Sequence, residues 1–479
     1  MDTRENGDEQ DVPPSASELG ITNASEELIP PSSSSRIADD ELAADEPEES
    51  FGPIAGLVKK FLRHIDGIGL AITIAMPAIA EAVEKFRSDA KDVLQPHIVN
   101  ENEDGYSVRI PPNQDHETSK VLKALHIIRK LDRSNIIFTT ERSMFIGIFS
   151  EFDAFVGDLL KLLYLEKTEL FNGMAREIAL SELLKFATIE DARNHLLDKE
   201  VDSIRRESYI EQFATLETKF SIKTLRGFSE WADFIEMAQR RNLMTHNGGI
   251  VSDQYIKVLE TLDYKLPQDV RVGAQLDLSY DYIIKALETL ATVAMMLAYT
   301  LWKKISPKNE KIDSALTSIV YDNLQAHRWK LAERFAQFSL TQSMCNNVSD
   351  LAKRIRIVNR SIALKNLNKD VEAYRILDEC DWTASVRDFK LAVHVLREEV
   401  NDAAEVMKDI GPKGELVSRR AYHDWPLFYK FRETPQFLDT YRLIYGADFL
   451  PTVKSNMDNE GAQENSDTGD STHSNITAT

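Results

Sequence analysis

The chain is poor in the residues that cross-link small secreted proteins or interrupt helices. Its 479 residues include only two cysteines, Cys345 and Cys380, which excludes a disulfide framework and fits a reducing cytoplasmic compartment. The acidic N-terminus lacks the basic and then apolar pattern of a secretory signal. Glycine and proline are sparse in the body of the chain, where apolar residues recur at helical spacing. We therefore expect an all-α cytoplasmic protein.

Long hydrophobic runs are also missing. The two most apolar segments are Gly67–Ala80 and Leu290–Trp302, and Pro77 interrupts the first. Both are shorter than the roughly 18 residues that a membrane-spanning helix needs. We expect both segments to be buried helices and expect no association with a membrane.

Several common chemical motifs are absent. The sequence has no Walker loop, Gly-rich dinucleotide turn, His-Glu-x-x-His or Gly-x-Ser-x-Gly pattern. It shows no paired carboxylates at metal-binding spacing, which argues against nucleotidyl transfer. We predict no metal and no cofactor, because six histidines lack the spacing of a zinc site: His64, His97, His126, His327, His394 and His423.

The excess of negative charge lies in the two ends of the chain. The net charge is −21, but residues 1–50 hold 15 acidic residues against Arg4 and Arg36, and residues 455–479 hold five acidic residues and no base. Removing these contributions of −13 and −5 leaves −3 for residues 51–454. The nearly neutral body is therefore compatible with a polyanion such as RNA as a partner.

Composition and periodicity divide the chain into five regions. Residues 1–50 and 455–479 have too little apolar surface to fold, so both are predicted to be disordered tails. Residues 51–139 form a helical and extended region, in which Tyr106–Ile110 is a possible strand. Residues 140–305 are predicted to form a four- or five-helix bundle, and residues 310–450 a helical-repeat domain.

Five helices are expected in the bundle. The first carries the apolar face from Ile146 to Leu163, and Gly157 does not stop it. The other four are expected at Ala179 to about Phe186, Glu190–Ile204, about Ser229–Thr245 and Tyr280–Ile305.

The region after the bundle shows a weak repeat. Helices at Trp329–Ala336, Val371–Leu377 and Asp402–Met407 each follow another amphipathic helix, at a spacing of roughly 30 to 40 residues. This spacing is typical of a tetratricopeptide-like (TPR-like) solenoid. A plain helical bundle is the alternative, because the regular repeat signature is absent.

The most informative segment is Arg240–Gly249. It sets Arg241 and His246 five residues apart at the end of an amphipathic helix. A guanidinium can neutralise charge on a phosphate, and an imidazole can exchange a proton with a ribose hydroxyl or a leaving oxygen. In a straight helix the two side chains would point about 140° apart. We expect the helix to end near Thr245, with Asn247-Gly248-Gly249 adopting left-handed conformations that free His246 to turn toward the arginine or a partner chain.

This segment resembles the Arg-x4-6-His motif of the HEPN superfamily. The match consists of Arg241, Asn242 and His246, and the predicted bundle looks like the HEPN architecture of four to five helices. The resemblance implies metal-independent cleavage of RNA, by homodimers whose two motifs line one cleft. Asn242 is expected to position a phosphate oxygen or the imidazole.

Two further segments carry the same resemblance. Phe149–Phe155 is similar to the first helix of HEPN proteins of bacterial toxin and anti-phage type, in which an acidic residue faces the motif. Glu151 is the first candidate for that residue and Asp153 the second. The segments Cys380–Ser385 and Asp424–Phe428 resemble the C-terminal tails of bacterial proteins with such domains, a resemblance that implies no activity for this region. Separately, the helical repeats are expected to sense or dock a protein partner.

The remaining basic residues have two interpretations. Arg240 can assist at the phosphate or lie on the solvated surface of the helix. A basic cluster between the helices that would flank the cleft can track an RNA backbone or form a solvated face interleaved with glutamates. The cluster consists of Arg205, Arg206, Lys219, Lys223 and Arg226.

Two functions follow from these patterns. The first is a HEPN-type endoribonuclease in toxin or anti-phage defence, with Arg241, His246 and Asn242 at its site. The alternative is a non-catalytic interaction protein, in which an inactive bundle that can still bind nucleotides is joined to a helical scaffold.

Overall fold

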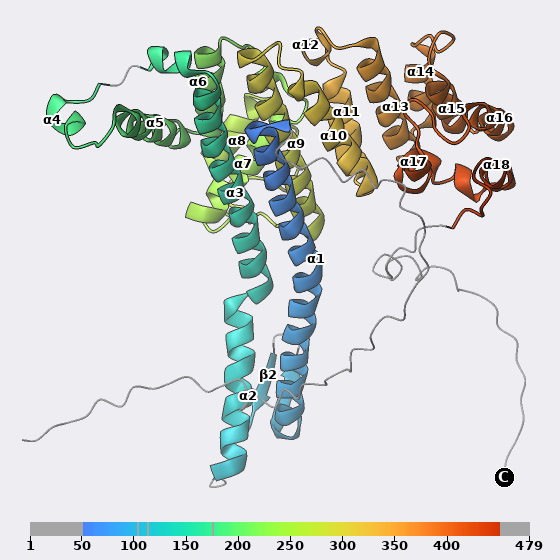
Figure 1. The fold of residues 1–479 in the computed structure, drawn as a ribbon. Helices are drawn as coiled ribbons and strands as arrows, with labels where there is room; N and C mark the ends of the chain where they lie inside the picture. The colour runs from blue at the N-terminus through green and yellow to red at the C-terminus, as the bar shows by residue number, and fades with distance from the viewer. Residues whose placement is uncertain (1–50, 103–104, 113–114, 175–176, 451–479) are drawn as a thin grey trace, which may run out of the picture. The chain divides into compact units, whose positions relative to one another are not determined.

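The computed structural model describes residues 51–450, except 103–104, 113–114 and 175–176 (Figure 1). Within that part the protein is mostly helical, with eighteen α-helices and one two-stranded sheet. This confirms the all-α prediction. The two predicted tails lie outside the described residues.

The N-terminal region is a long antiparallel helical hairpin (Figure 1). Helix α1 (Pro53–Leu94) packs against α2 (Asp115–Ser134) and α3 (Ile136–Glu166). Two contacts join α1 to the neighbouring helices, His64 to Glu151 of α3 and Arg87 to Asp132 of α2. A third joins His97, in the turn that follows α1, to Glu117 of α2. Strands β1 (Ile98–Asn102) and β2 (Gly105–Val108) close the hairpin as an antiparallel pair. The extended segment predicted at Tyr106–Ile110 therefore lies partly in β2.

The bundle follows the predicted helices closely in three places. Helices α5 (Ile189–Arg205), α7 (Trp231–His246) and α9 (Tyr280–Ile305) begin and end within two residues of the predictions. Helix α3 starts before the predicted bundle boundary at residue 140 and runs through Gly157. Helix α4 (Leu180–Leu183) is shorter than predicted, and the sequence patterns missed α6 (Tyr209–Phe220) and α8 (Asp253–Glu260).

The core of the bundle surrounds α9. Helices α1, α3, α6 and α7 all contact it, and the apolar segment Leu290–Trp302 is buried within it. The prediction for this segment is confirmed. One continuous hydrophobic cluster reaches from Ile54 on α1 to Tyr441 near the C-terminal end of the described chain. The predicted N-terminal region, bundle and repeat region therefore share a core.

The prediction for the other apolar segment is wrong. Gly67–Ala80 forms part of α1, and of its residues only Ile72 is buried, while Leu70 is 62% and Ile74 65% exposed. Length and composition alone make α1 and α9 apolar enough to cross a membrane, but the most apolar window is 78% buried in α9 and 11% buried in α1. The difference arises because α3 and α9 cover only part of the circumference of this segment, and at Gly69 and Leu70 it lines an open cavity shared with His327–Leu331.

Helices after the bundle pack in consecutive pairs. Helix α10 (Lys311–Gln325) contacts α11 (Trp329–Ser339), α13 (Asp350–Asn366) contacts α14 (Asp370–Asp378), and α15 (Arg387–Leu396) contacts α16 (Val400–Ile410). The second helix of each pair contains one of the three segments predicted from the repeat. The remaining helices of this region are α12 (Gln342–Cys345), α17 (Arg419–Asp424) and α18 (Pro435–Tyr445).

Candidate functional site

Helix α7 holds the Arg-x4-His segment in the middle of the bundle. Its apolar face is buried against α3, α6 and α9, and includes Trp231, Phe234, Ile235 and Ala238. Burial of this face stabilises the helix more than its intrinsic propensity does. This packing fixes the rotation of α7 about its axis. The directions of the side chains from Arg240 to His246 in the last two turns follow from it.

Arg241 lies at the edge of the buried face, as the sequence predicts. One terminal nitrogen donates a hydrogen bond to the Tyr209 hydroxyl at 3.0 Å and lies 3.5 Å from the Asp153 carboxylate. The guanidinium lies over the rings of Phe149 and Tyr209, and its side chain is 21% exposed. The Nε atom is buried and has no hydrogen-bond partner within the described part of the chain. Arg241 thus keeps an unused donor while its charge is partly compensated.

Asp153, and not Glu151, is the acidic residue that faces Arg241. Both residues are on α3, but they are two positions apart and so about 200° apart around the helix. Glu151 instead lies 3.1 Å from the His64 imidazole of α1. The first choice made from the sequence is therefore wrong and the second is confirmed as the neighbour of Arg241. The sequence could not distinguish Glu151 from Asp153, because only the packing of α3 on α7 decides which side of α3 meets the arginine.

Tyr209 completes a cluster that the sequence analysis missed. Its hydroxyl donates to Asp153 at 2.6 Å and accepts from Arg241. Burial raises the pKa of this phenol, and the Asp153 carboxylate raises it further, so the hydroxyl keeps its proton. The residue before it, Ser208, opens α6 with a capping box closed by Glu211. That Ser-x-x-Glu pattern is the signal that locates α6 and hence Tyr209.

Arg240 belongs to a second hydrogen-bond network, which is more deeply buried. It donates to the Glu236 carboxylate at 2.8 Å and to the backbone oxygen of Asp277 at 2.9 Å. Glu236 is 1% exposed and also accepts hydrogen bonds from the hydroxyls of Tyr255 and Tyr282. The interpretation of Arg240 as a solvated surface arginine is wrong, since its side chain is only 13% exposed. Within the chain it acts as the counter-ion of a buried glutamate.

His246 is exposed at the end of the helix. Helix α7 ends at His246, one position later than predicted, and Asn247 is its C-cap residue. Gly248 and Gly249 adopt the expected positive φ values of 60° and 83°, whereas Asn247 has φ −130°. Because the imidazole still belongs to the helix, it points about 140° away from Arg241 around the axis. The expected turn of His246 toward Arg241 does not occur within one chain.

Asn242 is half-buried beside Arg241. Among the described residues its side chain makes no hydrogen bond with the protein. Its amide therefore remains available as a donor or acceptor at the same end of α7.

The basic cluster is largely engaged in ion pairs. Lys219 binds Glu200 and Arg226 binds Glu217, and both glutamate side chains are only 10% exposed. Arg205 lies 3.9 Å from Asp202. These contacts favour a structural role for Lys219 and Arg226, whose partners are nearly buried, while Arg205, Arg206 and Lys223 are exposed. RNA binding by this cluster stays a prediction.

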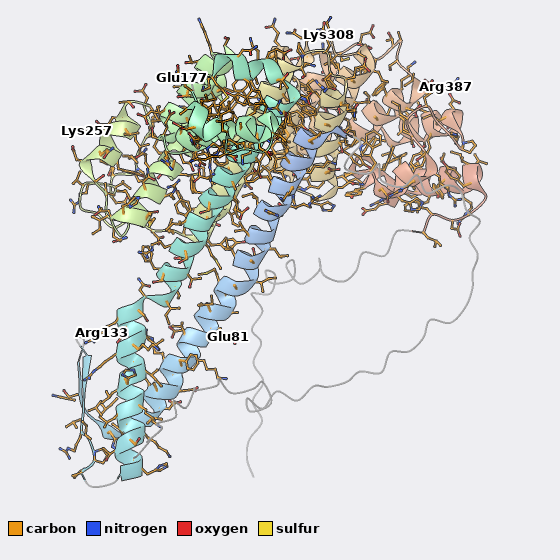
Figure 2. The ribbon with its side chains drawn as sticks, turned by 60° about the vertical axis from the view of Figure 1, so that its left-hand side comes forward. Glu81, Arg133, Glu177, Lys257, Lys308 and Arg387 are labelled. Carbon is orange, nitrogen blue, oxygen red and sulfur yellow. The ribbon has the colours of Figure 1, made fainter. Side chains whose placement is uncertain are left out.

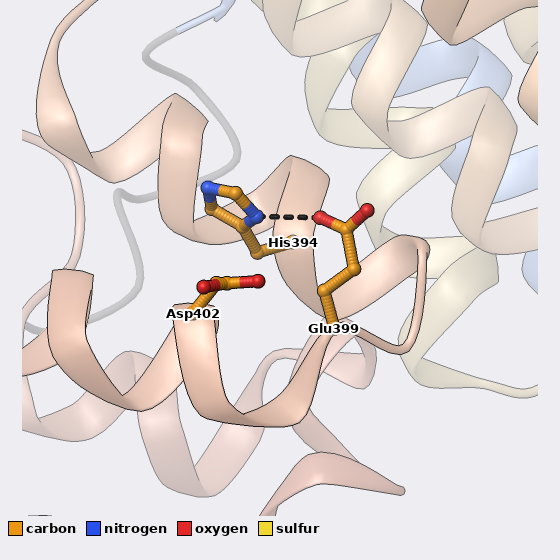
Figure 3. Close-up of side chains that lie close together, drawn as sticks. All are labelled: His394, Glu399 and Asp402. Carbon is orange, nitrogen blue, oxygen red and sulfur yellow. Dashed lines mark hydrogen bonds and ion pairs between the residues drawn. The ribbon is translucent and has the colours of Figure 1, made fainter.

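A group of possible metal ligands lies far along the chain, where α15 meets α16 (Figure 3). The ligand atoms of His394, Glu399 and Asp402 all lie within 4.8 Å of one another. The His-x4-Glu-x2-Asp spacing is not a zinc pattern, so the sequence did not reveal it. His394 Nδ1 and Glu399 are already hydrogen-bonded at 2.6 Å, which accounts for their proximity without an ion.

No family model, curated protein or solved structure matches the chain.

Proposed function

We propose that the chain is a metal-independent endoribonuclease of HEPN type. The observation that supports this most directly is the state of Arg241: Asp153 and Tyr209 hold its guanidinium in place, while its buried Nε donor has no partner in the part of the chain that the structure describes. A buried donor without a partner costs free energy that a phosphate oxygen would recover. The exposed imidazole of His246 follows on the same helix.

The chemistry assigned to these groups is transesterification. The His246 imidazole takes the proton from a ribose 2′-hydroxyl, and the 2′-oxygen then forms a bond to phosphorus while the bond from phosphorus to the 5′-oxygen breaks. Arg241 stabilises the negative charge that builds up on the phosphate oxygens. A second acid protonates the departing 5′-oxygen. The products are a 2′,3′-cyclic phosphate and a 5′-hydroxyl.

A second copy of the chain supplies what one chain lacks. The 140° separation of Arg241 and His246 keeps them from meeting on one phosphate within a single helix. Two copies would offer two imidazoles, one as base and one as acid, together with the Asn242 amide. The bundle around α3, α7 and α9 then serves as the HEPN-like unit, and the paired helices from α10 to α16 serve as a TPR-like region that binds a protein partner.

Cleavage of a labelled single-stranded RNA in EDTA tests this proposal. The wild-type chain is expected to cut the RNA and leave a cyclic phosphate that mass spectrometry detects, and an RNA with 2′-deoxy sugars is expected to resist. His246→Ala should lose at least about a hundredfold in rate without loss of stability, because the residue is exposed. His126→Ala, an exposed histidine on α2, is the matched control and should cut normally.

Two results would reject the ribonuclease: loss of cleavage when EDTA is added, or full cleavage by His246→Ala. Failure of the wild-type chain to cut any RNA supports the alternative, a non-catalytic interaction protein. One observation favours that alternative. Arg241 already has a carboxylate and a hydroxyl as partners, so a phosphate would have to share the guanidinium with them.

A further inference from the structure

One exposed face of α1 combines charge and apolarity in an ordered way. We define the α1 stripe by eight exposed residues at alternating intervals of three and four: Lys60, Arg63, Gly67, Leu70, Ile74, Pro77, Glu81 and Glu84. This spacing is that of the a and d positions of a coiled coil, so the eight residues lie along one side of the helix. The opposite side of α1, including Phe61, Ile65 and Ile72, is buried against the rest of the protein.

The centre of the stripe is an unusual surface for a protein in water. Leu70 and Ile74 are 62% and 65% exposed, and no charged residue occurs from Gly67 to Ala80. Nothing lies within 4 Å of the position that a Cβ would take on Gly67, so the helix surface is open there. A contiguous exposed apolar patch of this kind marks an interaction site.

The order of residues along the stripe identifies the partner. Reading from the N-terminal end, the stripe has two bases, four uncharged residues and two acids. In an antiparallel pair of identical stripes, Lys60 meets Glu84, Arg63 meets Glu81, Gly67 meets Pro77 and Leu70 meets Ile74. Each of these pairs occurs twice, as the twofold symmetry of an isologous interface requires.

We propose that α1 is the surface through which two copies of this chain pair antiparallel. In this arrangement opposite charges meet at both ends of the interface and large apolar residues meet at its centre. Between them, the exposed glycine of one helix meets the proline ring of the other. A parallel pair would instead place bases against bases and acids against acids. Figure 2 shows Glu81 on the part of the α1 hairpin that extends away from the packed helices, where a second helix can approach.

A lipid bilayer fits this surface less well. The uncharged run of 14 residues is about 21 Å long at 1.5 Å per residue, short of the roughly 30 Å of a bilayer core. It is followed at once by Glu81 and Glu84, which anionic lipids repel. The stripe is basic at one end and acidic at the other. A second, antiparallel stripe has the complementary charge at each end, whereas a uniformly charged surface does not.

Charge exchange tests the pairing with the full chain. The wild type is expected to have the mass of two chains by light scattering. Lys60→Glu/Arg63→Glu and Glu81→Lys/Glu84→Lys should each weaken association by about tenfold or more, because like charges then meet at both ends. The variant with all four substitutions should pair again, since the opposite charges are restored in exchanged positions. Lys120→Glu/Lys123→Glu on the exposed face of α2 makes the same charge change as the first variant and should remain paired.

The readout is particle mass, so the result does not depend on ribonuclease activity. Circular dichroism confirms that each variant remains helical. The proposal is overturned if the wild type is a single chain, if the two-residue variants stay paired, or if the four-residue variant stays apart. A single-chain wild type that sediments with phosphatidylcholine and phosphatidylglycerol vesicles would assign the stripe to a membrane instead.

Discussion

Two adjacent arginines of α7 have different surroundings. One step along the helix rotates the side chain by about 100°, so Arg240 and Arg241 meet different neighbours. Arg240 is enclosed by Glu236, Tyr282 and the backbone of Asp277. Arg241 meets Asp153 and Tyr209 and retains an unpaired Nε. The first arrangement is an ion pair enclosed by the protein, and the second leaves a buried donor without a partner among the described residues.

Removing the charge of Glu236 tests the structural assignment of Arg240. Glu236→Gln is expected to lower the free energy of unfolding by about 3 kcal/mol, because it leaves the buried Arg240 guanidinium without its counter-ion. Urea denaturation followed by circular dichroism measures the change.

Asp233→Asn is the matched control on the same helix. Asp233 pairs with Lys285 in a more exposed position, with its side chain 35% exposed, so the loss should stay below about 1 kcal/mol. Equal losses in the two variants would show that the Glu236 network contributes no more than a surface ion pair.

The end of α7 depends on two glycines that do different things. Gly249 donates its N–H to the Leu243 oxygen and accepts from Leu276, which ties the helix end to the following segment. A Cβ on Gly249 would lie 2.5 Å from Gln275 Nε2 and 2.9 Å from Met244 Sδ, whereas a Cβ on Gly248 meets nothing within 4 Å. Both have positive φ, so both substitutions are strained, but only one also collides.

This contrast gives a paired prediction. Gly248→Ala should cost about 1 kcal/mol from the left-handed backbone alone. Gly249→Ala should cost about 2 kcal/mol or more, since Gln275 must also leave its hydrogen bond to the Gly248 oxygen. Thermal denaturation of the two variants measures the difference. If Gly248→Ala proves the more damaging, the close approach of Gln275 and Met244 does not occur in solution.

Local sequence signals predicted the positions of helices better than they predicted the contacts between helices. The bounds of α5, α7 and α9 follow from apolar periodicity and terminal residues, because both are properties of the element itself. Helix α6 was missed although Ser208 and Glu211 form its capping box. The choice between Glu151 and Asp153 was beyond local signals, since it depends on how α3 is rotated against α7.

The described chain contains one large core and two small separate clusters. The main cluster extends through the bundle and the paired helices. The far end of the α1–α2 hairpin has its own cluster of Ala90, Leu94, Val121, Ala124 and Ile128. Fewer buried apolar contacts hold this end, so it should open on its own.

Hydrogen exchange measured by mass spectrometry tests that inference. Amides of residues 84–94 and 116–130 should exchange roughly a hundredfold faster than those of residues 286–302 in α9, because local opening exposes only the five buried apolar residues of the small cluster. Leu94→Ala should speed exchange in the hairpin and leave α9 unchanged. Equal loss of protection in both regions would mean that the hairpin and the bundle unfold as one unit.

The sequence by itself determined the helical class, the positions of most helices in the bundle and the location of the Arg-x4-His segment. These depend on periodicity and on residues that begin or end helices, which are local properties of the chain. Tertiary packing decided that Arg240 is buried, that Asp153 faces Arg241, and that Gly67–Ala80 is exposed. Each of these depends on which face of a helix meets a neighbour distant in sequence, and composition does not encode that choice.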